Sequence, residues 1–370
     1  MKVNWRSIAA AKNSYAALHA ACEQWGYELQ EVRRPRPDIT CYSLNTVTER
    51  LLCNEIANAP CITIAGGPHA TACYREVAKY ADYVVVGEGE YTLPALLASL
   101  EEGKETVPRG VATAAGYEPA RHTVLLDGVP PFSTVKGYVE ITRGCPHGCG
   151  YCQTPRIFGR CMRHRSIDSI AAYASRYRDA RFVTPNALAY GSDGVNLRLD
   201  KVERLLKRLD NRIYFGTFPS EVRPESITRA SMEVLMKYCA NRRLHFGAQS
   251  GSDRVLRQIR RGHSVGDVVR ALDLCRESGM TPVVDFIVGL PCEDDEDERA
   301  TLDLIRTVTR YGIAHVHYFM PLPNTPLADT RPRRLLPETE RYLGRLALSG
   351  KVTGSWVDTE IRFFRRSPHL

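Results

Sequence analysis

The segment "ITRGCPHGCGYCQTPRIFGR", residues 141–160, places three cysteines close together in a glycine-rich loop. Cys145, Cys149 and Cys152 form a C-x3-C-x2-C array. Three glycines in the same loop permit the tight backbone path that wrapping a compact group requires: Gly144, Gly148 and Gly150. Three thiols at this spacing predict a metal-binding loop.

The number of thiols helps to distinguish a zinc site from an iron–sulfur cluster. A structural zinc site closes with four ligands, and here the fourth would have to be His147 or the more distant Cys161. A [4Fe–4S] cluster normally uses four thiolates, so three leave one iron corner open. An open iron can bind the amine and carboxylate of a substrate. We therefore interpret the loop as the holder of an incompletely ligated [4Fe–4S] cluster, with a zinc knuckle as the alternative.

Composition excludes several classes of protein. The chain has 370 residues, 44% hydrophobic and 25% charged, with a formal net charge of +8, which is ordinary for a globular protein. We find no apolar run long enough for a membrane span. The first residues read as a strand and a helix, not as a secretory signal, so we expect a cytoplasmic protein. Twelve cysteines in such a chain argue against a disulfide framework.

Alternating strand and helix patterns predict an α/β protein with two domains. Within residues 1–130, "DITCYSLNT", "CITIAGG" and "YVVVGEGE" read as parallel strands of a doubly wound, Rossmann-like sheet, followed by a turn-rich linker. Residues 131–325 contain about six further strand–helix units, which fit a partial (βα)6 TIM-type barrel. The cysteine loop follows the first of these strands, at the face where such barrels carry their chemistry. Residues 326–370 form a short C-terminal extension.

Across residues 138–325 the sequence resembles a radical S-adenosylmethionine (SAM) enzyme. The segments "GAQSGSDRVLRQIRRGH", "VVDFIVGLP" and "YFMPLPNTPL" resemble the fourth, fifth and sixth strand segments of that family. The resemblance implies that the open iron binds SAM by its amine and carboxylate. By motif position it implies these SAM contacts: Tyr151 and Ile287 at the adenine, Glu221 and Gln249 at the amine or ribose, Arg261 at the carboxylate, and Asp285 at the ribose.

In the first domain, "ITIAGGPHATA" and "DYVVVGEGEYTLPALL" resemble the cobalamin-binding domain of the B12-dependent radical SAM enzymes. Glycines at strand ends let the backbone approach a bulky corrinoid. The resemblance implies a cobalamin site made by Ser43, Thr46, Gly66, Gly67, His69, Gly87, Glu88, Gly89 and Glu90. The D-x-H-x-x-G motif that supplies a cobalt-ligating histidine in other cobalamin proteins is absent. We therefore do not expect His69 to ligate cobalt.

The two resemblances together imply a class B, cobalamin-dependent radical SAM C-methyltransferase. Its cofactors are the [4Fe–4S] cluster, SAM and methylcobalamin, and a 5′-deoxyadenosyl radical takes hydrogen from the unactivated sp3 carbon that is methylated. Such an enzyme works anaerobically and needs a low-potential electron donor. We name no catalytic side chain, because this chemistry requires no protein acid or base.

The chain is compact, and the arginine-rich "RIFGRCMRHRS" follows the cysteine loop directly. We therefore expect a peptide or protein substrate and a post-translational modification. The segments "CPHGCGYCQTPRIFGRCMRHRS" and "GGPHATA" resemble the compact methanogen enzymes of this group. One of these methylates the α-carbon of a glutamine in methyl-coenzyme M reductase.

Three other functions fit parts of the pattern. A non-methylating cobalamin radical SAM cyclase shares the motifs. An RNA methylthiotransferase has similar barrel segments, but that family also carries a second cluster and a C-terminal RNA-binding barrel, for which the last 45 residues are too few. A zinc-dependent nucleic-acid-binding module is supported only by the charge. Because the arginine-rich block lacks interleaved aromatic residues, we do not expect nucleic acid as a partner. We do not expect a membrane partner either, because no apolar run is long enough for a span.

Overall fold

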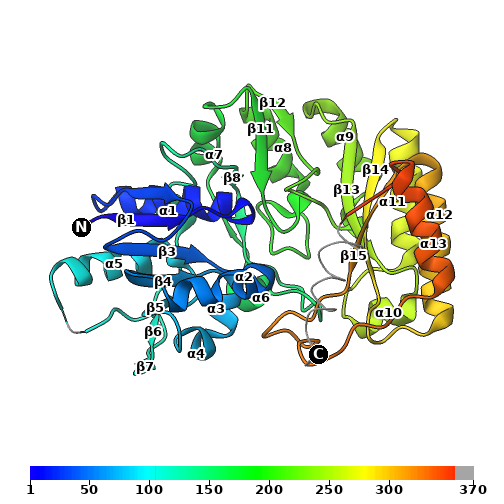
Figure 1. The fold of residues 1–370 in the computed structure, drawn as a ribbon. Coiled ribbons are helices and arrows are strands. Elements are labelled where there is room, and N and C mark those ends of the chain that lie inside the picture. Colours follow the sequence, from blue (N-terminus) through cyan, green and yellow to red (C-terminus); the bar gives the residue numbers. More distant parts are fainter. Residues whose placement is uncertain (105, 355–370) are drawn as a thin grey trace. The chain divides into compact units, whose positions relative to one another are not determined.

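The computed structural model describes residues 1–104 and 106–354. The chain folds as two compact units, shown in Figure 1. Unit 1 comprises Met1–Glu140 and Arg156–Phe158, and unit 2 comprises Ile141–Pro155 and Gly159–Leu370. Strands and helices alternate in both, which confirms the predicted α/β class. Among the described residues, every helix is too short or too polar to cross a membrane.

Unit 1 is built on a seven-stranded sheet with the order β2-β1-β3-β4-β5-β6-β7. The strands β1 to β5 run parallel, and β6 and β7 add an antiparallel hairpin beside β5. The order 2-1-3-4-5 is that of a doubly wound fold, whose ligand crevice lies at the carboxyl ends of β1 and β3. The strands are Val3–Arg6 (β1), Leu29–Val32 (β2), Ile39–Ser43 (β3), Ile62–Gly66 (β4), Tyr83–Val85 (β5), Val111–Thr113 (β6) and Gly116–Tyr117 (β7).

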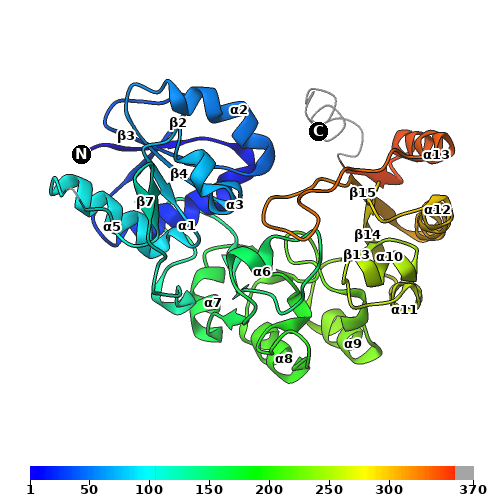
Figure 2. The same ribbon diagram turned by 90° about the horizontal axis from the view of Figure 1, so that it is seen from below.

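Helices cover both faces of this sheet, as Figure 2 shows. Side chains alternate between the two faces along β3: Cys41 packs in the core that includes Leu93 and Leu96 of α5, whereas Tyr42 packs in the core that includes Leu52 of α2. The unit therefore has two apolar layers, one on each side of the sheet. The helices are Lys12–Glu23 (α1), Thr46–Ala57 (α2), Pro68–Ala72 (α3), Tyr74–Val77 (α4) and Gly89–Glu101 (α5).

Unit 2 is a partial barrel made of three short sheets. Their strand orders are β10-β9, β12-β11-β8 and β13-β14-β15-β16, and the last is wholly parallel. The segment "YVEITRG", expected to be one strand, is divided at Ile141, because its first half lies beside β11 and its second half pairs with β10. Strand β8 (Val139–Glu140) comes directly before the first residue assigned to unit 2. The strands within unit 2 are Thr142–Arg143 (β9), Arg163–His164 (β10), Asp179–Val183 (β11), Arg212–Tyr214 (β12), Arg243–Gln249 (β13), Thr281–Val288 (β14), Ile313–Tyr318 (β15) and Val352–Thr353 (β16).

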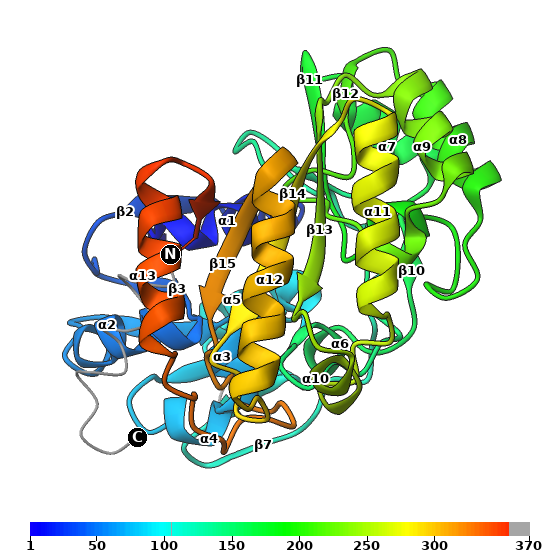
Figure 3. The ribbon, with the colours of Figure 1, turned by 90° about the vertical axis from the view of Figure 1, so that its right-hand side faces the viewer.

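Helices pack against one face of the parallel sheet only. Figure 3 shows α11 and α12 lying against β13, β14 and β15. Val284 and Phe286 of β14 are fully buried on the helix side, whereas Asp285 and Ile287 alternate with them and lie half-buried on the inner face. Helix α6 (Thr154–Ile157) is divided between the two units, since Arg156 and Ile157 are assigned to unit 1. The helices within unit 2 are Ile167–Ala174 (α7), Leu199–Arg208 (α8), Arg229–Tyr238 (α9), Asp253–Gln258 (α10), Val265–Glu277 (α11), Asp295–Tyr311 (α12) and Pro337–Leu348 (α13).

The described part of the C-terminal extension belongs to the same sheet. Strand β16 pairs in parallel with β15, so Thr353 stands beside His315. Arg333 also ties this segment to α12 by ion pairs with Asp295 and Glu298. The sequence predicts a short C-terminal extension, and its described part supplies the edge strand of the parallel sheet of unit 2. Residues 355–370 lie outside the described residues.

Candidate active site

The three cysteines of the metal-binding loop lie between β9 and α6 of the chain. The loop is held from three sides by backbone hydrogen bonds: Cys145 N–H to the carbonyl of Gly159 at 3.1 Å, Gly150 N–H to the carbonyl of Ile259 at 2.8 Å, and Leu327 N–H to the carbonyl of Gly150 at 3.2 Å. Gly144 has a φ of 89°, and a Cβ there would lie 2.2 Å from the carbonyl oxygen of Cys161. The loop path therefore depends on a glycine at this position.

Buried polar atoms around the loop fit a bound cluster. The Nε2 of His147 and the Nε of Arg261 are buried without a hydrogen-bond partner among the described residues, which normally costs stability unless a ligand compensates. No three cysteine, histidine or acidic side chains in the described residues converge on a single ion. A cluster spreads its thiolates over separate iron corners, so the donor set fits a cluster better than a zinc knuckle.

Arg261 places a guanidinium beside the thiols. It lies on the loop between α10 and α11, and its Nη1 donates to the Cys149 sulfur at 3.9 Å. Its Nη2 donates to the carbonyl of Gly247, on β13, at 3.2 Å. The buried Arg223 in turn donates to the backbone carbonyl of Arg261. A planar fork fixed in this way can hold a carboxylate that approaches the cluster.

Two carboxyl groups face the same interior. Burial, with a smaller contribution from Glu221, raises the pKa of Asp285 to about 7. Burial likewise raises the pKa of Glu221. A buried carboxyl pair of this kind is stabilised by an incoming cation. The sulfonium of SAM would provide one.

A bulge at the end of β13 shapes the space between these groups. The pairing register with β14 shifts between Gly247 and Gln249, and Gln249 has a φ of 68° with its side chain buried. A Cβ on Gly247 would lie 2.0 Å from the Nε2 of Gln249 and 3.0 Å from the Nη2 of Arg261. Gly247 therefore keeps open the space that the two functional side chains occupy.

Tyr151 and Ile287 lie in one apolar cluster. Both pack against buried Ile259, Leu290 and Phe319. Burial raises the pKa of Tyr151, so its phenol stays protonated at neutral pH. Two residues that the resemblance assigns to the adenine are thus brought together from segments far apart in the sequence. A flat aromatic base can pack on such a surface.

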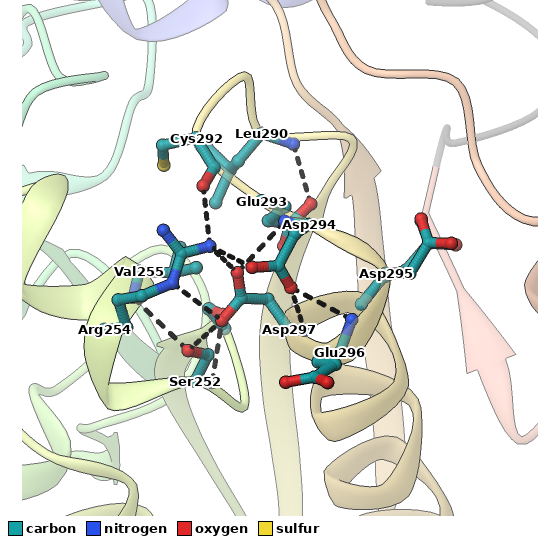
Figure 4. A network of polar contacts seen from close by, with 12 residues as sticks. Ser252, Arg254, Val255, Leu290, Cys292, Glu293, Asp294, Asp295, Glu296 and Asp297 are labelled. Atoms are coloured by element: carbon teal, nitrogen blue, oxygen red, sulfur yellow. Dashed lines mark hydrogen bonds and ion pairs between the residues drawn. The ribbon is translucent and has the colours of Figure 1, made fainter.

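Polar contacts around Arg254 hold the loop that follows β14 (Figure 4). Its guanidinium donates to Asp294 at 2.9 Å, to the Cys292 carbonyl at 3.1 Å, and to Asp297. Ser252 also donates to Asp297, at 2.5 Å. This network anchors the start of α12, five residues beyond Leu290. Because Cys292 also packs against the apolar cluster, the network fixes the loop at the edge of that cluster.

In unit 1, five of the nine residues assigned to cobalamin meet at the carboxyl ends of β3 and β4. They are Ser43, Thr46, Gly66, Gly67 and His69. The ring Nδ1 of His69 lies 3.4 Å from the Thr46 hydroxyl. The backbone N–H of His69 donates to the Leu44 carbonyl at 3.0 Å. Burial lowers the pKa of His69, so its ring is neutral at neutral pH. These atoms line the strand ends next to the β1–β3 switch point, where a doubly wound sheet binds ligands.

Gly67 makes the turn at this edge possible. Its φ is 95°, and a Cβ there would lie 2.8 Å from the Leu44 carbonyl oxygen and 3.1 Å from the Ser43 hydroxyl. Gly87, after β5, also has a positive φ of 87° and donates to the Thr71 hydroxyl at 3.0 Å. No atom of the described residues stands within 4 Å of a Cβ added to Gly87. Both glycines therefore keep side chains away from the strand ends.

The residues after Gly87 are engaged in packing. The Glu88 carboxylate accepts from the N–H of Val124 at 3.1 Å. A Cβ on Gly89 would meet Leu18 at 3.0 Å, and Glu90 is buried within the first turn of α5. These three residues are held by their own unit, so a cobalamin role for them stays a prediction.

Several polar residues of unit 2 were not singled out in the sequence. Arg223, Glu225 and His263 surround Arg261; burial and the neighbouring arginines lower the pKa of His263 to about 3. Inner-face positions of the strands carry Arg181, His245, His315 and His317. The spacing H-x-H in "HVHYF" was a usable signal, because alternate residues of a strand share a face.

Comparison with known proteins agrees with this geometry. Residues 139–305 match the radical SAM superfamily. The fold is similar to that of the radical SAM methyltransferase TsrM from Kitasatospora setae, solved with cobalamin and a [4Fe–4S] cluster (TM-score 0.65, 18% identity, 89% of this chain and 74% of that one). It is also similar to the cobalamin-dependent SAM radical enzyme OxsB, solved with aqua-cobalamin (TM-score 0.63, 16% identity, 95% of this chain and 55% of that one).

Among curated proteins, a tRNA-2-methylthio-N(6)-dimethylallyladenosine synthase of Geobacter sulfurreducens is 31% identical over 227 residues, which cover 57% of this chain. The chain spans about half the length of that relative, 49%. The similarity of fold to TsrM and OxsB extends over both units, whereas the radical SAM match begins at residue 139. Residues 139–305 are therefore similar to the radical SAM superfamily, and the fold of the chain is similar to the folds of TsrM and OxsB.

Proposed function

We propose that the protein is a cobalamin-dependent radical SAM C-methyltransferase that acts on an unactivated sp3 carbon. The observation that carries the proposal is the meeting of Cys149, Arg261 and the Asp285 carboxyl within unit 2. A guanidinium beside a thiol and a raised-pKa carboxyl on the same inner face suit a ligand with a carboxylate at one end and a cation next to it. SAM has both.

The protein's own residues would bind the cofactors and orient SAM. Cys145, Cys149 and Cys152 would hold the [4Fe–4S] cluster, and the strand ends at Ser43, Gly66, Gly67 and His69 would hold cobalamin. When bound, the cluster supplies the electron that cleaves SAM, and cobalamin supplies the methyl group. Arg261 would fix the SAM carboxylate, and Asp285 would hold its ribose. The apolar cluster at Tyr151 and Ile287 would exclude water from the adenosyl group.

The proposed substrate is a peptide or protein, and the specific candidate is the glutamine α-carbon of methyl-coenzyme M reductase. The arginine-rich stretch after the cysteine loop supports an acidic protein surface, because Arg156 and Arg160 are both exposed. A second candidate, RNA methylthiotransfer, is favoured by the identity to the Geobacter synthase. The mass added to the product separates the two, since methylation adds one carbon and methylthiolation also adds sulfur.

The test is anaerobic reconstitution with iron, sulfide, hydroxocobalamin and SAM, followed by quantification of 5′-deoxyadenosine and S-adenosylhomocysteine with the candidate peptide. The proposal expects both products and a methylated peptide. A Cys149→Ala variant should lose cluster absorbance and deoxyadenosine formation and keep corrinoid binding. Cys161→Ala is the matched control, because Cys161 is exposed and outside the array. Deoxyadenosine from the Cys149→Ala protein would refute the ligand assignment.

A further inference from the structure

The loop that carries Arg261 begins with a strained end of α10. The backbone N–H of Arg260 donates to the carbonyl of Arg257 at 3.0 Å. The next N–H, that of Arg261, donates to the carbonyl of Leu256 at 2.9 Å. This pair of bonds closes a helix by the Schellman motif, which usually has glycine in its left-handed position. Here the left-handed residue is Arg260, with a φ of 55°. Because a side chain disfavours this conformation, contacts outside α10 must hold Arg261 where it lies.

The end of β13 provides the first of these contacts. The Nη2 of Arg261 donates to the Gly247 carbonyl at 3.2 Å. The ring Nε2 of His263 lies 3.1 Å from the Ala248 carbonyl, and the His263 side chain has no exposed surface. A carbonyl oxygen only accepts, so Nε2 carries the ring hydrogen and donates it. The loop is therefore tied to two consecutive peptide groups of β13.

Arg223 contacts the same loop from another segment of the chain. Its Nη2 donates to the backbone carbonyl of Arg261, and its Nε donates to the Glu225 carboxylate. The Arg223 side chain is 5% exposed. Val222, directly before it, is buried, and its N–H donates to the carbonyl of His245 at 2.9 Å. Arg223 therefore reaches Arg261 from a fixed position, with its donors directed at the protein.

Glu225 and His263 face each other beside this contact. The Oε2 of Glu225 lies 3.8 Å from the Nδ1 of His263. Burial, with smaller contributions from Arg261 and Arg223, lowers the pKa of His263 to about 3, so the ring is neutral at neutral pH. With its hydrogen on Nε2, the ring has an acceptor at Nδ1, and an ionised carboxylate is an acceptor too. The hydrogen bond of Glu225 in this network is therefore the one that it accepts from Arg223.

We propose that Arg223 and Glu225 are positioning residues that hold Arg261 ready for the SAM carboxylate. Glu225 orients the Arg223 guanidinium, and Arg223 fixes the backbone from which the Arg261 side chain extends. This inference rests on the proposed function, because it takes the SAM carboxylate as the ligand of Arg261. A side chain that is ordered before its ligand arrives loses less entropy on binding. Loss of the network should therefore weaken SAM binding without removing a group that touches SAM.

The test compares Glu225→Gln with Glu225→Ala in the full-length, reconstituted protein. Both variants remove the negative charge near Arg261, so the ratio of their SAM affinities reports geometry alone. An amide can still accept from Arg223 and can donate to the Nδ1 of His263, whereas alanine does neither.

SAM affinity is measured by anaerobic equilibrium dialysis with an oxidised cluster and is expressed per cluster bound. Glu225→Ala should bind SAM about three- to tenfold more weakly than Glu225→Gln, which is the cost of ordering one long side chain on binding. Rescue by the amide is not expected of a carboxylate that acts through its charge. Equal affinities of the two variants would overturn the inference.

Hydrogen–deuterium exchange measures the order of the loop without SAM. The reporter is the Arg261 amide, which its bond to the Leu256 carbonyl protects. Glu225→Ala should raise its exchange rate at least about threefold over that of Glu225→Gln, because local opening becomes easier. Arg223→Lys is a second variant that should exchange as Glu225→Ala does. Its single ammonium keeps the charge but cannot replace a guanidinium fork that contacts two groups.

Arg229→Gln is the control, because Arg229 lies on α9 and its ion pair with Glu277 at 3.1 Å is exposed. It should change neither SAM affinity nor exchange of the Arg261 amide. If wild type binds SAM, equal affinities or equal exchange rates in the two Glu225 variants refute this inference alone. The expected exchange pattern, in a wild-type protein that carries its cluster and binds no SAM, refutes the proposed function alone.

Discussion

The raised pKa of Asp285 makes SAM affinity depend on pH. In the SAM-free protein, burial and the neighbouring Glu221 raise the pKa of this carboxyl to about 7. A bound SAM cation favours the ionised carboxylate, so binding removes the proton. Only about one-tenth of the Asp285 groups are ionised at pH 6, against about nine-tenths at pH 8. SAM should therefore bind about tenfold more tightly at pH 8 than at pH 6, a difference of about 1.4 kcal/mol.

The assay is anaerobic equilibrium dialysis of radiolabelled SAM against reconstituted protein with an oxidised cluster, so that no SAM is cleaved. The comparison is with Asp285→Asn, which cannot titrate. The amine of SAM also titrates near pH 8, but it does so in both proteins and cancels in their ratio. The ratio of wild-type to variant affinity should rise about tenfold from pH 6 to pH 8. A ratio that stays constant over this range would show that Asp285 does not contact the SAM cation.

The stability of the SAM-free protein gives an independent check. A carboxyl whose folded-state pKa lies above its unfolded value of 3.8 contributes stability below that value and loses it as pH rises through about 7. Wild type should therefore lose stability relative to Asp285→Asn between pH 4 and pH 8, measured by thermal unfolding. Equal pH dependence of the two proteins would contradict the pKa shift itself.

Three further substitutions test other parts of the structure. Gly247→Ala forces a Cβ to within 2.0 Å of Gln249, so it should weaken SAM binding at least about tenfold while the cluster still assembles. In its control, Gly266→Ala, the added Cβ meets only Ser264 at 3.5 Å, so SAM binding should be unchanged. Equal SAM affinities in the two variants would be evidence against a SAM site beside Gln249 and Arg261. Arg254→Ala leaves the buried Asp297 without its ion-pair partner and should lower the free energy of unfolding by about 1–3 kcal/mol in urea titrations, allowing for the partial exposure of Arg254. Removal of the exposed Arg306–Asp303 pair should lower the free energy of unfolding by less than about 1 kcal/mol. A similar loss in the two variants would contradict the stabilising role of the Arg254 network. Gly67→Ala, at a φ of 95°, should abolish corrinoid uptake and leave iron content normal; full cobalt loading of this variant would exclude the β4 edge as the site.

Local patterns predicted most of the fold. The period-two alternation of β13, β14 and β15 and the longer amphipathic runs of α11 and α12 are each contained in one segment, so the alternation of strands and helices could be read directly. The cysteine array is also local, because three ligands fall within eight residues, 145–152. Both features depend on spacing along the chain, which the sequence displays.

The features that the sequence did not reveal depend on contacts between distant segments. Gly89 packs beneath Leu18, and Glu88 binds the backbone of Val124, so the "VGEGE" motif points partly into its own unit. Arg181 and His245 occupy inner-face positions of strands β11 and β13, and they are more than 60 residues apart in the sequence. The single strand expected at "YVEITRG" is divided at Ile141, where the neighbouring strand changes from β11 to β10. Such tertiary contacts override local propensity.

The central claim is that the three-cysteine loop holds a [4Fe–4S] cluster with one open iron that binds SAM. The most direct measurement is electron paramagnetic resonance of the dithionite-reduced, anaerobically reconstituted protein, recorded before and after SAM is added. We predict a reduced-cluster signal whose g-values shift when SAM binds, because a new ligand alters the electronic structure of the iron. A protein that takes up no iron, or a cluster signal that SAM leaves unchanged, would contradict the account.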